Sequence, residues 1–322
     1  MSDVVDRDGV VDCDGVVLGA GLRGLGAALR WPVRPGETVR IVDRQSRAGG
    51  SVRTQRSNGF VCELGPFAFE EAAIAPLLEV LERPPAVLAS GCDTGAVFDG
   101  ARLNPCPVEP RPVSFAGGCE DLVQACRREL GDRMWLGREA VEIRPADSGG
   151  FAIALGGEVP ATLTARQLVL ALPMANAARL LAGFDRALVD VADRLEREPR
   201  AFVFLGGLTR DCRELAGYGI APAEDVPSAA VEAIFCGNVF PGRCLPDRAL
   251  VRVELAGDPA QGDDAALAER AVAELRRWTG TAAEFPFVKV HRFETIARDA
   301  TRAECRARFA GIAARAPGLA MA

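Results

Sequence analysis

The chain has 322 residues, of which 49% are hydrophobic, and a formal net charge of −6 at pH 7. This length predicts about two domains and leaves ample apolar residues for their cores. The acidic balance argues against nucleic acid or an anionic membrane surface as the main partner.

A glycine-rich turn follows the first predicted strand. Residues 16–18 are typical of a short buried strand, and Gly19, Gly21 and Gly24 then give G-x-G-x-x-G spacing before a helix-like run at 25–30. Gly19 permits a tight turn, Gly21 lets a pyrophosphate approach the backbone, and Gly24 lets helix and strand pack closely. The N-terminus of the helix then faces the phosphate charge.

An acidic residue ends the second predicted strand, residues 38–42. Asp43 lies nineteen residues beyond Gly24, where a carboxylate accepts hydrogen bonds from a ribose diol. This strand–turn–helix–strand–acid context predicts nucleotide binding. The alternative is an ordinary β-α-β unit whose glycines serve packing alone.

A second glycine pair follows the acid directly. The candidate cofactor-binding residues in this stretch are Arg44, Arg47, Gly49, Gly50, Gly65 and Pro66. Simple nicotinamide dehydrogenases run from the ribose acid into the next helix, so a second glycine turn flanked by arginines favours a longer, extended cofactor. Arg44 beside Asp43 would also suit a 2′-phosphate, which keeps NADP as a lesser alternative. For Arg47 and Arg53 the alternative is a solvated turn.

Hydrophobic periodicity predicts the later elements. Helices are expected at residues 70–81, 121–130, 174–181, 263–278 and 301–314. Strands are expected at 134–136, 141–143, 202–205, 229–235, 250–255 and 287–290, with a hairpin over 151–155 and 161–163 that turns at Gly156-Gly157. The longest apolar region, residues 168–183, is broken by Pro173 and is too short to span a bilayer.

The sequence offers no acid–base set, so the catalytic residues stay unassigned. His291, the only histidine, lies at a strand end beside Arg292, which favours a structural role over a general base. Tyr218 and Phe240 are expected to pack the second sheet. The ten cysteines lack C-x-x-C spacing and, with a single histidine, predict no metal site. Most of them are expected to be buried thiols.

Motifs in order along most of the chain resemble the protoporphyrinogen oxidase family, within the flavin amine oxidases. Residues 16–66 are similar to the FAD-binding start of that family. The later motifs are the glycine-pair turn and helix of 114–124, the strand 139–143, the V-x-A-x-P strand of 167–173, and the segments 217–222 and 240–243. The first motif is shared by many flavoproteins, and the last two are more specific.

The resemblance implies FAD as cofactor and an α/β fold, in which a Rossmann-like FAD-binding domain joins a reduced, sheet-based substrate domain. It places Leu22 in the pyrophosphate turn and backbone contacts to adenine at Val141. The implied activity is oxidation of protoporphyrinogen IX to protoporphyrin IX in haem biosynthesis, by hydride transfer to flavin and reoxidation by oxygen or a quinone. The expected FAD-binding domain comprises residues 1–68, 116–183 and 293–322, and the substrate domain residues 69–115 and 184–292.

Two departures from the family pattern indicate an internal deletion and a missing C-terminal FAD motif. Relatives carry a long helical, membrane-contacting segment where this chain runs almost directly from Pro107 to Ser114, and Gly95 stands where some place a propionate-binding arginine. Residues 317–322 resemble the lead into the last family strand, and 292–300 match a family motif poorly. A degenerate, non-catalytic relative that has lost flavin or substrate binding therefore stays open, as does an NAD(P)-dependent reductase.

These features predict a cytoplasmic protein with a small-molecule substrate, porphyrinogen-like by resemblance alone. The acidic N-terminus is unlike a signal peptide, and free thiols suit a reducing compartment. The missing helical segment argues against membrane contact. Loss of the closing helix would expose an apolar groove, which leaves oligomerisation open.

Overall fold

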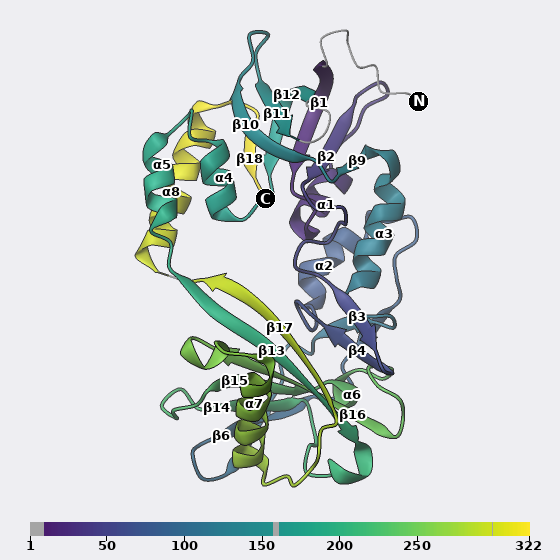
Figure 1. Ribbon diagram of the computed structural model, residues 1–322. Helices are drawn as coiled ribbons and strands as arrows, with labels where there is room; N and C mark the ends of the chain where they lie inside the picture. The colour runs from purple at the N-terminus through teal and green to yellow at the C-terminus, as the bar shows by residue number, and fades with distance from the viewer. Residues whose placement is uncertain (1–9, 157–160, 298) are drawn as a thin grey trace.

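The computed structural model describes residues 10–156, 161–297 and 299–322, and Figure 1 shows two sheet-based parts, one above the other. The upper part contains the parallel sheet and most of the helices. The lower part contains the second sheet and one long helix, α7. The predicted α/β class, with a Rossmann-like domain and a second sheet domain, is confirmed.

The first sheet has seven strands in the order β10-β11-β12-β1-β2-β9, and β18 pairs with the later half of β12. Strands β12, β1, β2, β9 and β18 are mutually parallel, whereas β11 is antiparallel to both of its neighbours. Their bounds are β1 Val10–Leu18, β2 Val39–Asp43, β9 Met134–Leu136, β10 Glu139–Pro145, β11 Phe151–Gly156, β12 Ala161–Leu170 and β18 Leu319–Met321. β1 lies between β12 and β2, and its apolar residues 16–18 are buried because helices cover both faces there.

Helices pack on both faces of this sheet (Figure 1). On one face lie α1 Leu22–Leu29, α2 Glu71–Leu78 and α3 Glu120–Leu130, which bury Leu25, Ile74 and Leu122 with Val17 and Ile41 of the sheet. On the other face lie α4 Met174–Leu180, α5 Arg186–Asp193 and α8 Ala300–Arg315, which bury Leu188 and Phe309 with Val16 and Leu18. The turn between β1 and α1 is thereby held at the carboxyl edge of a fully packed sheet.

The second sheet has seven strands in the order β17-β13-β16-β15-β14-β6-β7, all antiparallel except for the β14–β6 pair. Their bounds are β6 Thr94–Phe98, β7 Leu103–Pro107, β13 Arg197–Leu208, β14 Gly219–Pro222, β15 Ala230–Phe235, β16 Arg248–Ala256 and β17 Phe287–Ile296. Helix α7, Asp264–Thr279, covers one face and packs against Val203 and Leu205. Asp263 caps α7 by accepting a hydrogen bond from the Ala266 N–H at 2.8 Å.

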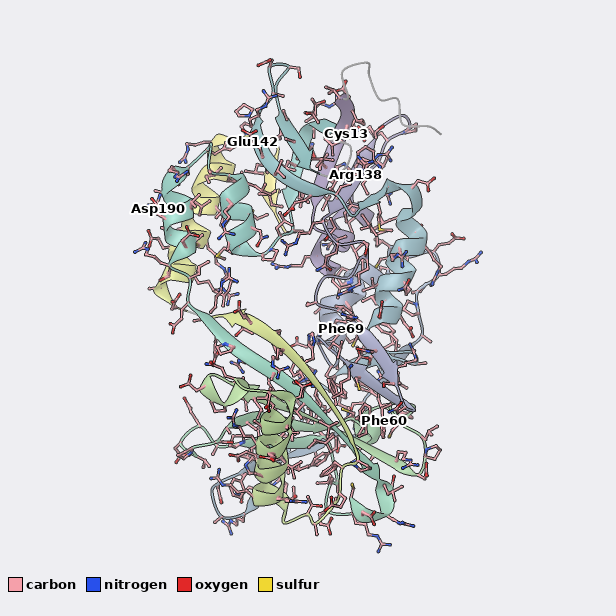
Figure 2. The ribbon with its side chains drawn as sticks, viewed as in Figure 1. Cys13, Phe60, Phe69, Arg138, Glu142 and Asp190 are labelled. Atoms are coloured by element: carbon pink, nitrogen blue, oxygen red, sulfur yellow. The ribbon has the colours of Figure 1, made fainter. Side chains whose placement is uncertain are left out.

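Successive side chains of β13 point to opposite faces of the second sheet. Phe202 and Phe204 point away from α7 and join a core cluster with Phe60 and Phe67 from the first part of the chain. Phe60 begins strand β4, Phe60–Glu63, and lies where this strand meets the second sheet (Figure 2), with its ring centroid 4.5 Å from that of Phe287. This cluster therefore joins the two domains.

The remaining elements are short. They are β3 Thr54–Ser57 paired with β4 Phe60–Glu63, β5 Val87–Ala89 paired with β8 Val113–Phe115, the helix α6 Cys236–Val239, and the 3₁₀ turns η1 Gly131–Arg133, η2 Thr209–Asp211 and η3 Asp258–Ala260.

The predicted helices and strands form, with ends shifted by a few residues. The predicted hairpin is β11 and β12, which pair antiparallel; of its turn residues, Gly157 lies outside the described residues. Helix α2 and helix α5 contribute to the cores around the first sheet, because their apolar residues face α1 and α4 respectively.

Candidate functional site

Three glycines build the turn between β1 and α1, and each meets a different constraint. Gly19 has a φ of +104°, and a Cβ there would lie 2.5 Å from the Ala171 carbonyl oxygen. A Cβ on Gly24 would overlap the Gly19 carbonyl oxygen, so Gly24 allows α1 to pack onto the turn. Gly21 has a φ of −71°, and its Cβ would meet the Gly50 Cα at 3.9 Å, an ordinary contact. Folding alone therefore does not demand glycine at position 21, and the space beside it is open to a ligand.

The second glycine pair lies against this turn, backbone to backbone. The Gly49 N–H donates to the Ala20 carbonyl oxygen at 2.7 Å. Gly49 and Gly50 have φ values of +112° and +58°, and a Cβ on Gly50 would lie 3.1 Å from the Gly21 Cα. A side chain at Gly50 would push the two loops apart, and one at Gly49 would press on the Val52 carbonyl oxygen 2.9 Å away. Glycine at both positions therefore allows the loops to form one continuous wall.

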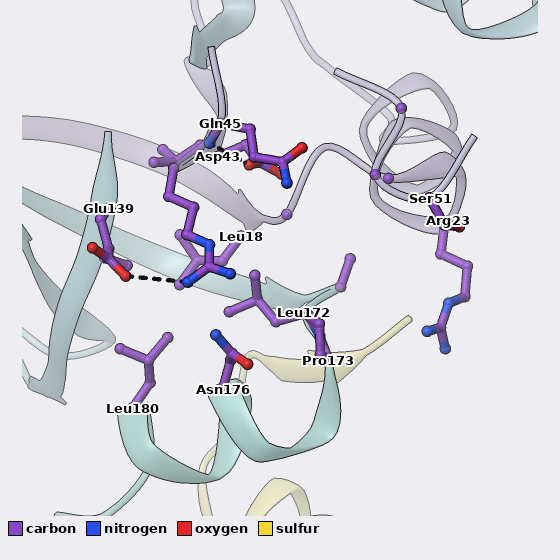
Figure 3. Close-up of a pocket in the computed structure, with 18 of the residues that line it drawn as sticks. Leu18, Arg23, Asp43, Gln45, Ser51, Glu139, Leu172, Pro173, Asn176 and Leu180 are labelled. Atoms are coloured by element: carbon purple, nitrogen blue, oxygen red, sulfur yellow. Dashed lines mark hydrogen bonds and ion pairs between the residues drawn. The ribbon is translucent and has the colours of Figure 1, made fainter. Parts of the chain in front are cut away.

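Asp43, at the end of β2, points its carboxylate at the same turn. Its Oδ2 accepts a hydrogen bond from the Ala20 N–H at 2.7 Å, and its Oδ1 accepts one from the Gln45 N–H at 2.8 Å (Figure 3). Two backbone groups thus fix the carboxylate in place. Each oxygen keeps further lone-pair capacity, which suits a pair of ribose hydroxyls.

Beyond Asp43, strand β10 borders the site. The Arg44 Nη1 lies 3.8 Å from the Glu139 Oε1, and both side chains are more than half exposed (Figure 3). Val141 is the extra residue of a β-bulge, because its two neighbours in β10 pair with consecutive residues of β11. A bulge takes a residue out of the strand ladder, so Val141 is placed to offer its backbone groups to a ligand.

These loops line a cavity of about 950 Å³, at the upper end of the range for small-molecule sites. The predicted residues that line it are Gly19, Gly21, Leu22, Asp43, Arg44, Gly49, Gly50, Pro66 and Val141. Figure 3 shows Leu172 and Pro173 leading into helix α4, whose residues Asn176 and Leu180 also line the cavity. The cavity therefore extends from the β10 bulge, past both glycine loops, to the start of α4.

Three predicted residues stand behind the cavity wall. Gly24 has the packing role described above. A Cβ on Gly65 would overlap the Ser51 carbonyl oxygen, so Gly65 allows the chain to pass close behind the second loop. Arg47 donates to the Gly50 carbonyl oxygen at 2.7 Å and to two further carbonyl oxygens of the same loop at 3.2 Å. Arg47 thus stabilises the loop from within.

Several polar lining residues are absent from the predicted set. They are Arg23, Gln45, Ser51, Arg138, Glu139, Asn176 and Arg179. Asn176 and Arg179 are three residues apart in α4, directly after the predicted strand that ends at Pro173. Side chains at this spacing share one face of a helix, so the helix that follows the strand is the signal for both residues.

A buried polar cluster lies close behind the second loop. Glu63 is 1% exposed, and its Oε1 accepts a hydrogen bond from the Cys119 N–H at 2.9 Å. Arg243 is fully buried; its Nη2 donates to the Ser114 Oγ at 2.7 Å and to the Phe115 carbonyl oxygen at 3.2 Å, and lies 3.8 Å from the Glu63 Oε1. Burial raises the pKa of Glu63, although its hydrogen bonds and Arg243 oppose the rise.

The side chains expected to be structural are packed. His291 stacks on Phe293 with ring centroids 6.1 Å apart, and burial, followed by the charges of Arg53 and Lys289, lowers its pKa. Phe240 is fully buried in the interdomain cluster, and Tyr218 packs against it. Seven of the ten cysteines are buried, as predicted.

The part of the chain that the structure describes lacks two kinds of feature. Within residues 10–156, 161–297 and 299–322, no group of three or more His, Cys, Asp or Glu side chains could hold a metal ion. The same part of the chain has no helix that is long and apolar enough to cross a membrane.

The glycine turn and the acid that ends the next strand are typical of a Rossmann-like dinucleotide-binding domain. Residues 17–83 match the family model for the NAD(P)-binding Rossmann-like domain, and residues 107–307 match that for flavin containing amine oxidoreductases. Because the second match covers more than half of the chain, the protein belongs to the flavin-containing amine oxidoreductase family.

Solved structures share this fold at low sequence identity. A protein from Exiguobacterium sp. 255-15 with the provisional name protoporphyrinogen oxidase is 15% identical, with a TM-score of 0.78 over 96% of this chain and 93% of that one. Reduced UDP-galactopyranose mutase is 14% identical, with a TM-score of 0.76 over 96% and 89%. A putrescine oxidase variant is 14% identical, with a TM-score of 0.65 over 88% and 85%. At these identities the similarity shows the fold alone.

The family and the Rossmann-like domain identify FAD as the cofactor, and the residues present fit it. The open space beside Gly21 suits a pyrophosphate at the N-terminus of α1. The fixed carboxylate of Asp43 suits a ribose. When bound, FAD supplies a flavin ring that accepts a hydride.

Proposed function

We propose that this protein is an FAD-dependent oxidase of the protoporphyrinogen oxidase type, which holds FAD in the cavity between the two glycine loops and β10. The observation that carries this proposal is the open space beside Gly21, bordered by Gly50 and by the fixed carboxylate of Asp43. Position 21 has room for a larger residue in the protein alone, so glycine there supports close approach of a ligand to the backbone.

In this proposal each part of the cavity wall binds a different part of the cofactor. The N–H groups at the start of α1 donate to the pyrophosphate, and Asp43 accepts from the ribose hydroxyls. The bulge at Val141 offers backbone groups to the adenine. Glu139 beside Arg44 adds negative charge where a 2′-phosphate would bind, which favours FAD over NADP by electrostatic repulsion.

The second domain packs against the first beside this cavity. Phe67, Phe202 and Phe240 are buried together at the junction of the two domains, with Phe67 and Phe240 ring centroids 5.4 Å apart, and Phe67 directly follows Pro66 of the cavity wall. The junction would therefore orient the second domain relative to the loops that bind the cofactor.

Protoporphyrinogen IX is the substrate that the motif resemblance supports, together with the fold shared with the Exiguobacterium protein. Putrescine oxidase and UDP-galactopyranose mutase share the same fold at similar identity. Putrescine and UDP-galactopyranose are therefore the informative comparison substrates.

The test begins with the purified full chain, incubated with FAD and passed through a gel-filtration column. A retained flavin spectrum, followed by oxygen- or quinone-dependent formation of fluorescent porphyrin from protoporphyrinogen IX, is the expected result. A folded but colourless protein would identify a non-catalytic relative. If the protein retains flavin and turns over putrescine alone, putrescine would take the place of protoporphyrinogen IX as the proposed substrate. Preferential binding of a nicotinamide nucleotide would overturn FAD as the cofactor.

A further inference from the structure

A single arginine of the second sheet contacts the residues on both sides of Pro66, which lines the cavity. Arg252 lies on β16 and is 4% exposed. Its Nη1 donates to the Gly65 carbonyl oxygen at 2.9 Å, and its guanidinium carbon lies 5.3 Å from the centroid of the Phe67 ring. The position of Pro66 in the cavity wall therefore depends on a residue of the other domain.

Arg252 is itself held within the second sheet. Its Nη2 donates to the Glu232 Oε1 at 3.2 Å, and its guanidinium carbon lies 4.2 Å from the centroid of the Phe202 ring. A planar guanidinium can stack on aromatic rings while it donates hydrogen bonds in its own plane, which the ammonium of lysine cannot do. Its Nε is buried without a hydrogen-bond partner among the described residues. Because an unpaired buried N–H is destabilising, stability alone does not account for arginine at this position.

The contact continues from Gly65 to the second glycine loop. A Cβ on Gly65 would overlap the Ser51 carbonyl oxygen, so the backbone of Gly65 lies directly against it. Ser51 and Pro66 both line the cavity. Movement of residues 65–67 would therefore displace two parts of the cavity wall together.

We propose that Arg252 is a positioning residue that couples the second sheet to the FAD cavity by holding residues 65–67. This inference rests on the proposed assignment of the cavity to FAD. Removal of the guanidinium then weakens FAD binding in a chain that is still folded, because the cavity wall loses its support from the second domain.

The full chain offers a matched control on the same face of the same sheet. Arg200 forms ion pairs with Glu198 at 2.8 Å and with Glu254 at 3.0 Å, both within the second sheet. Arg252 is buried and Arg200 is half-buried, and both are paired with glutamate. Arg200→Met therefore measures the loss of a paired arginine without loss of the contact to the cavity wall.

The experiment measures two quantities for each variant: the Kd for FAD, from quenching of flavin fluorescence, and the melting temperature without FAD. We expect Arg252→Met to raise the Kd roughly tenfold, as for one lost charge-assisted hydrogen bond. Arg200→Met should leave the Kd unchanged, whatever its effect on melting. Arg252→Lys should give an intermediate Kd, and it carries the test if Arg252→Met fails to fold.

The outcomes separate this inference from the proposed function. An unsubstituted chain that binds no FAD would overturn both. Tight binding by the unsubstituted chain and equally tight binding by the Arg252 variants would overturn only the positioning role. Equal weakening by Arg200→Met and Arg252→Met would also overturn it, because general loosening of the sheet would then explain both.

Discussion

Replacing Gly21 with alanine separates cofactor binding from folding. Gly21 has φ −71° and ψ 171°, a conformation open to alanine, and the new Cβ would meet the Gly50 Cα at 3.9 Å. Alanine is a poorer helix N-cap than glycine, whereas removal of a glycine stabilises the fold by about 0.4–1 kcal/mol through the unfolded chain. Because these effects oppose each other, we expect the free energy of unfolding without FAD to change by less than about 1 kcal/mol.

The affinity for FAD should change much more. In Gly21→Ala a methyl group occupies the space through which the proposed pyrophosphate reaches the N–H groups at the start of α1. One charge-assisted hydrogen bond contributes about 1.5–3 kcal/mol. Loss of a single such bond weakens binding roughly 10- to 150-fold.

Titration with FAD, followed by quenching of flavin fluorescence, and urea unfolding without FAD together measure both effects. Gly24→Ala is the control in which the fold itself should be destabilised. Its Cβ would overlap the Gly19 carbonyl oxygen, and overpacking costs about 1–3 kcal/mol. A Gly21→Ala chain that binds FAD like the unsubstituted protein would refute the pyrophosphate assignment. If Gly21→Ala loses as much free energy of unfolding as Gly24→Ala, the inference that the space beside Gly21 is free would be refuted.

Three further substitutions test other parts of the site. Asp43→Asn would turn an amide NH₂ toward a backbone N–H of the turn, and we expect FAD binding to weaken by about 1–3 kcal/mol in the same titration; an unchanged Kd would contradict the ribose assignment. Burial raises the pKa of Glu63 above its ordinary value of 4.5, so the native chain binds protons that the unfolded chain releases, and stability falls as pH rises through the raised pKa. For Glu63→Gln, urea unfolding at a series of pH values should show a smaller fall in the free energy of unfolding as pH rises. A fall identical to that of the unsubstituted protein would argue against a raised pKa at Glu63. Arg243→Met removes the donors to the Phe115 carbonyl oxygen and the cation near Glu63, and should lower the free energy of unfolding by about 2–5 kcal/mol, whereas a loss below 1 kcal/mol would show that the cluster contributes little.

The glycine turns could be predicted from the sequence because their constraints are local. Positive φ values at Gly19, Gly49 and Gly50 arise within a few residues of the strands they follow, and glycine is the residue that such backbone tolerates. Asp43 could be predicted for the same reason, since it directly ends a strand beside the turn. Nine of the twelve predicted residues accordingly line the cavity.

The rest depends on contacts between distant parts of the chain. The apolar stripe of α2 predicts a helix, but not the sheet on which it packs. Helix α5 spans eight residues, three of them charged, which is too short for a clear periodicity. The contact from Arg252 to Gly65 requires the register of β16 and the docking of two domains, which a single sequence does not specify.

Two of the family motifs meet at the junction of the two domains. Arg243 of the segment 240–243 donates to Ser114 and Phe115 in the glycine-pair segment, as Arg252 donates to Gly65. In both cases an arginine of the second domain donates to a backbone carbonyl oxygen of a residue outside the second sheet. The arginines lie over Phe240 and Phe67, respectively.

The contacts of this arginine–aromatic junction bear on which conclusions the family motifs support. Residues 240–243 and the glycine-pair segment hold the domains together, and they do not belong to the lining of the described cavity. Any enzyme with this domain arrangement would need such a junction, whatever its substrate. The motifs therefore support the family and the domain arrangement more strongly than the porphyrinogen substrate. Variants of the junction should accordingly alter FAD affinity and stability before they alter the choice of substrate.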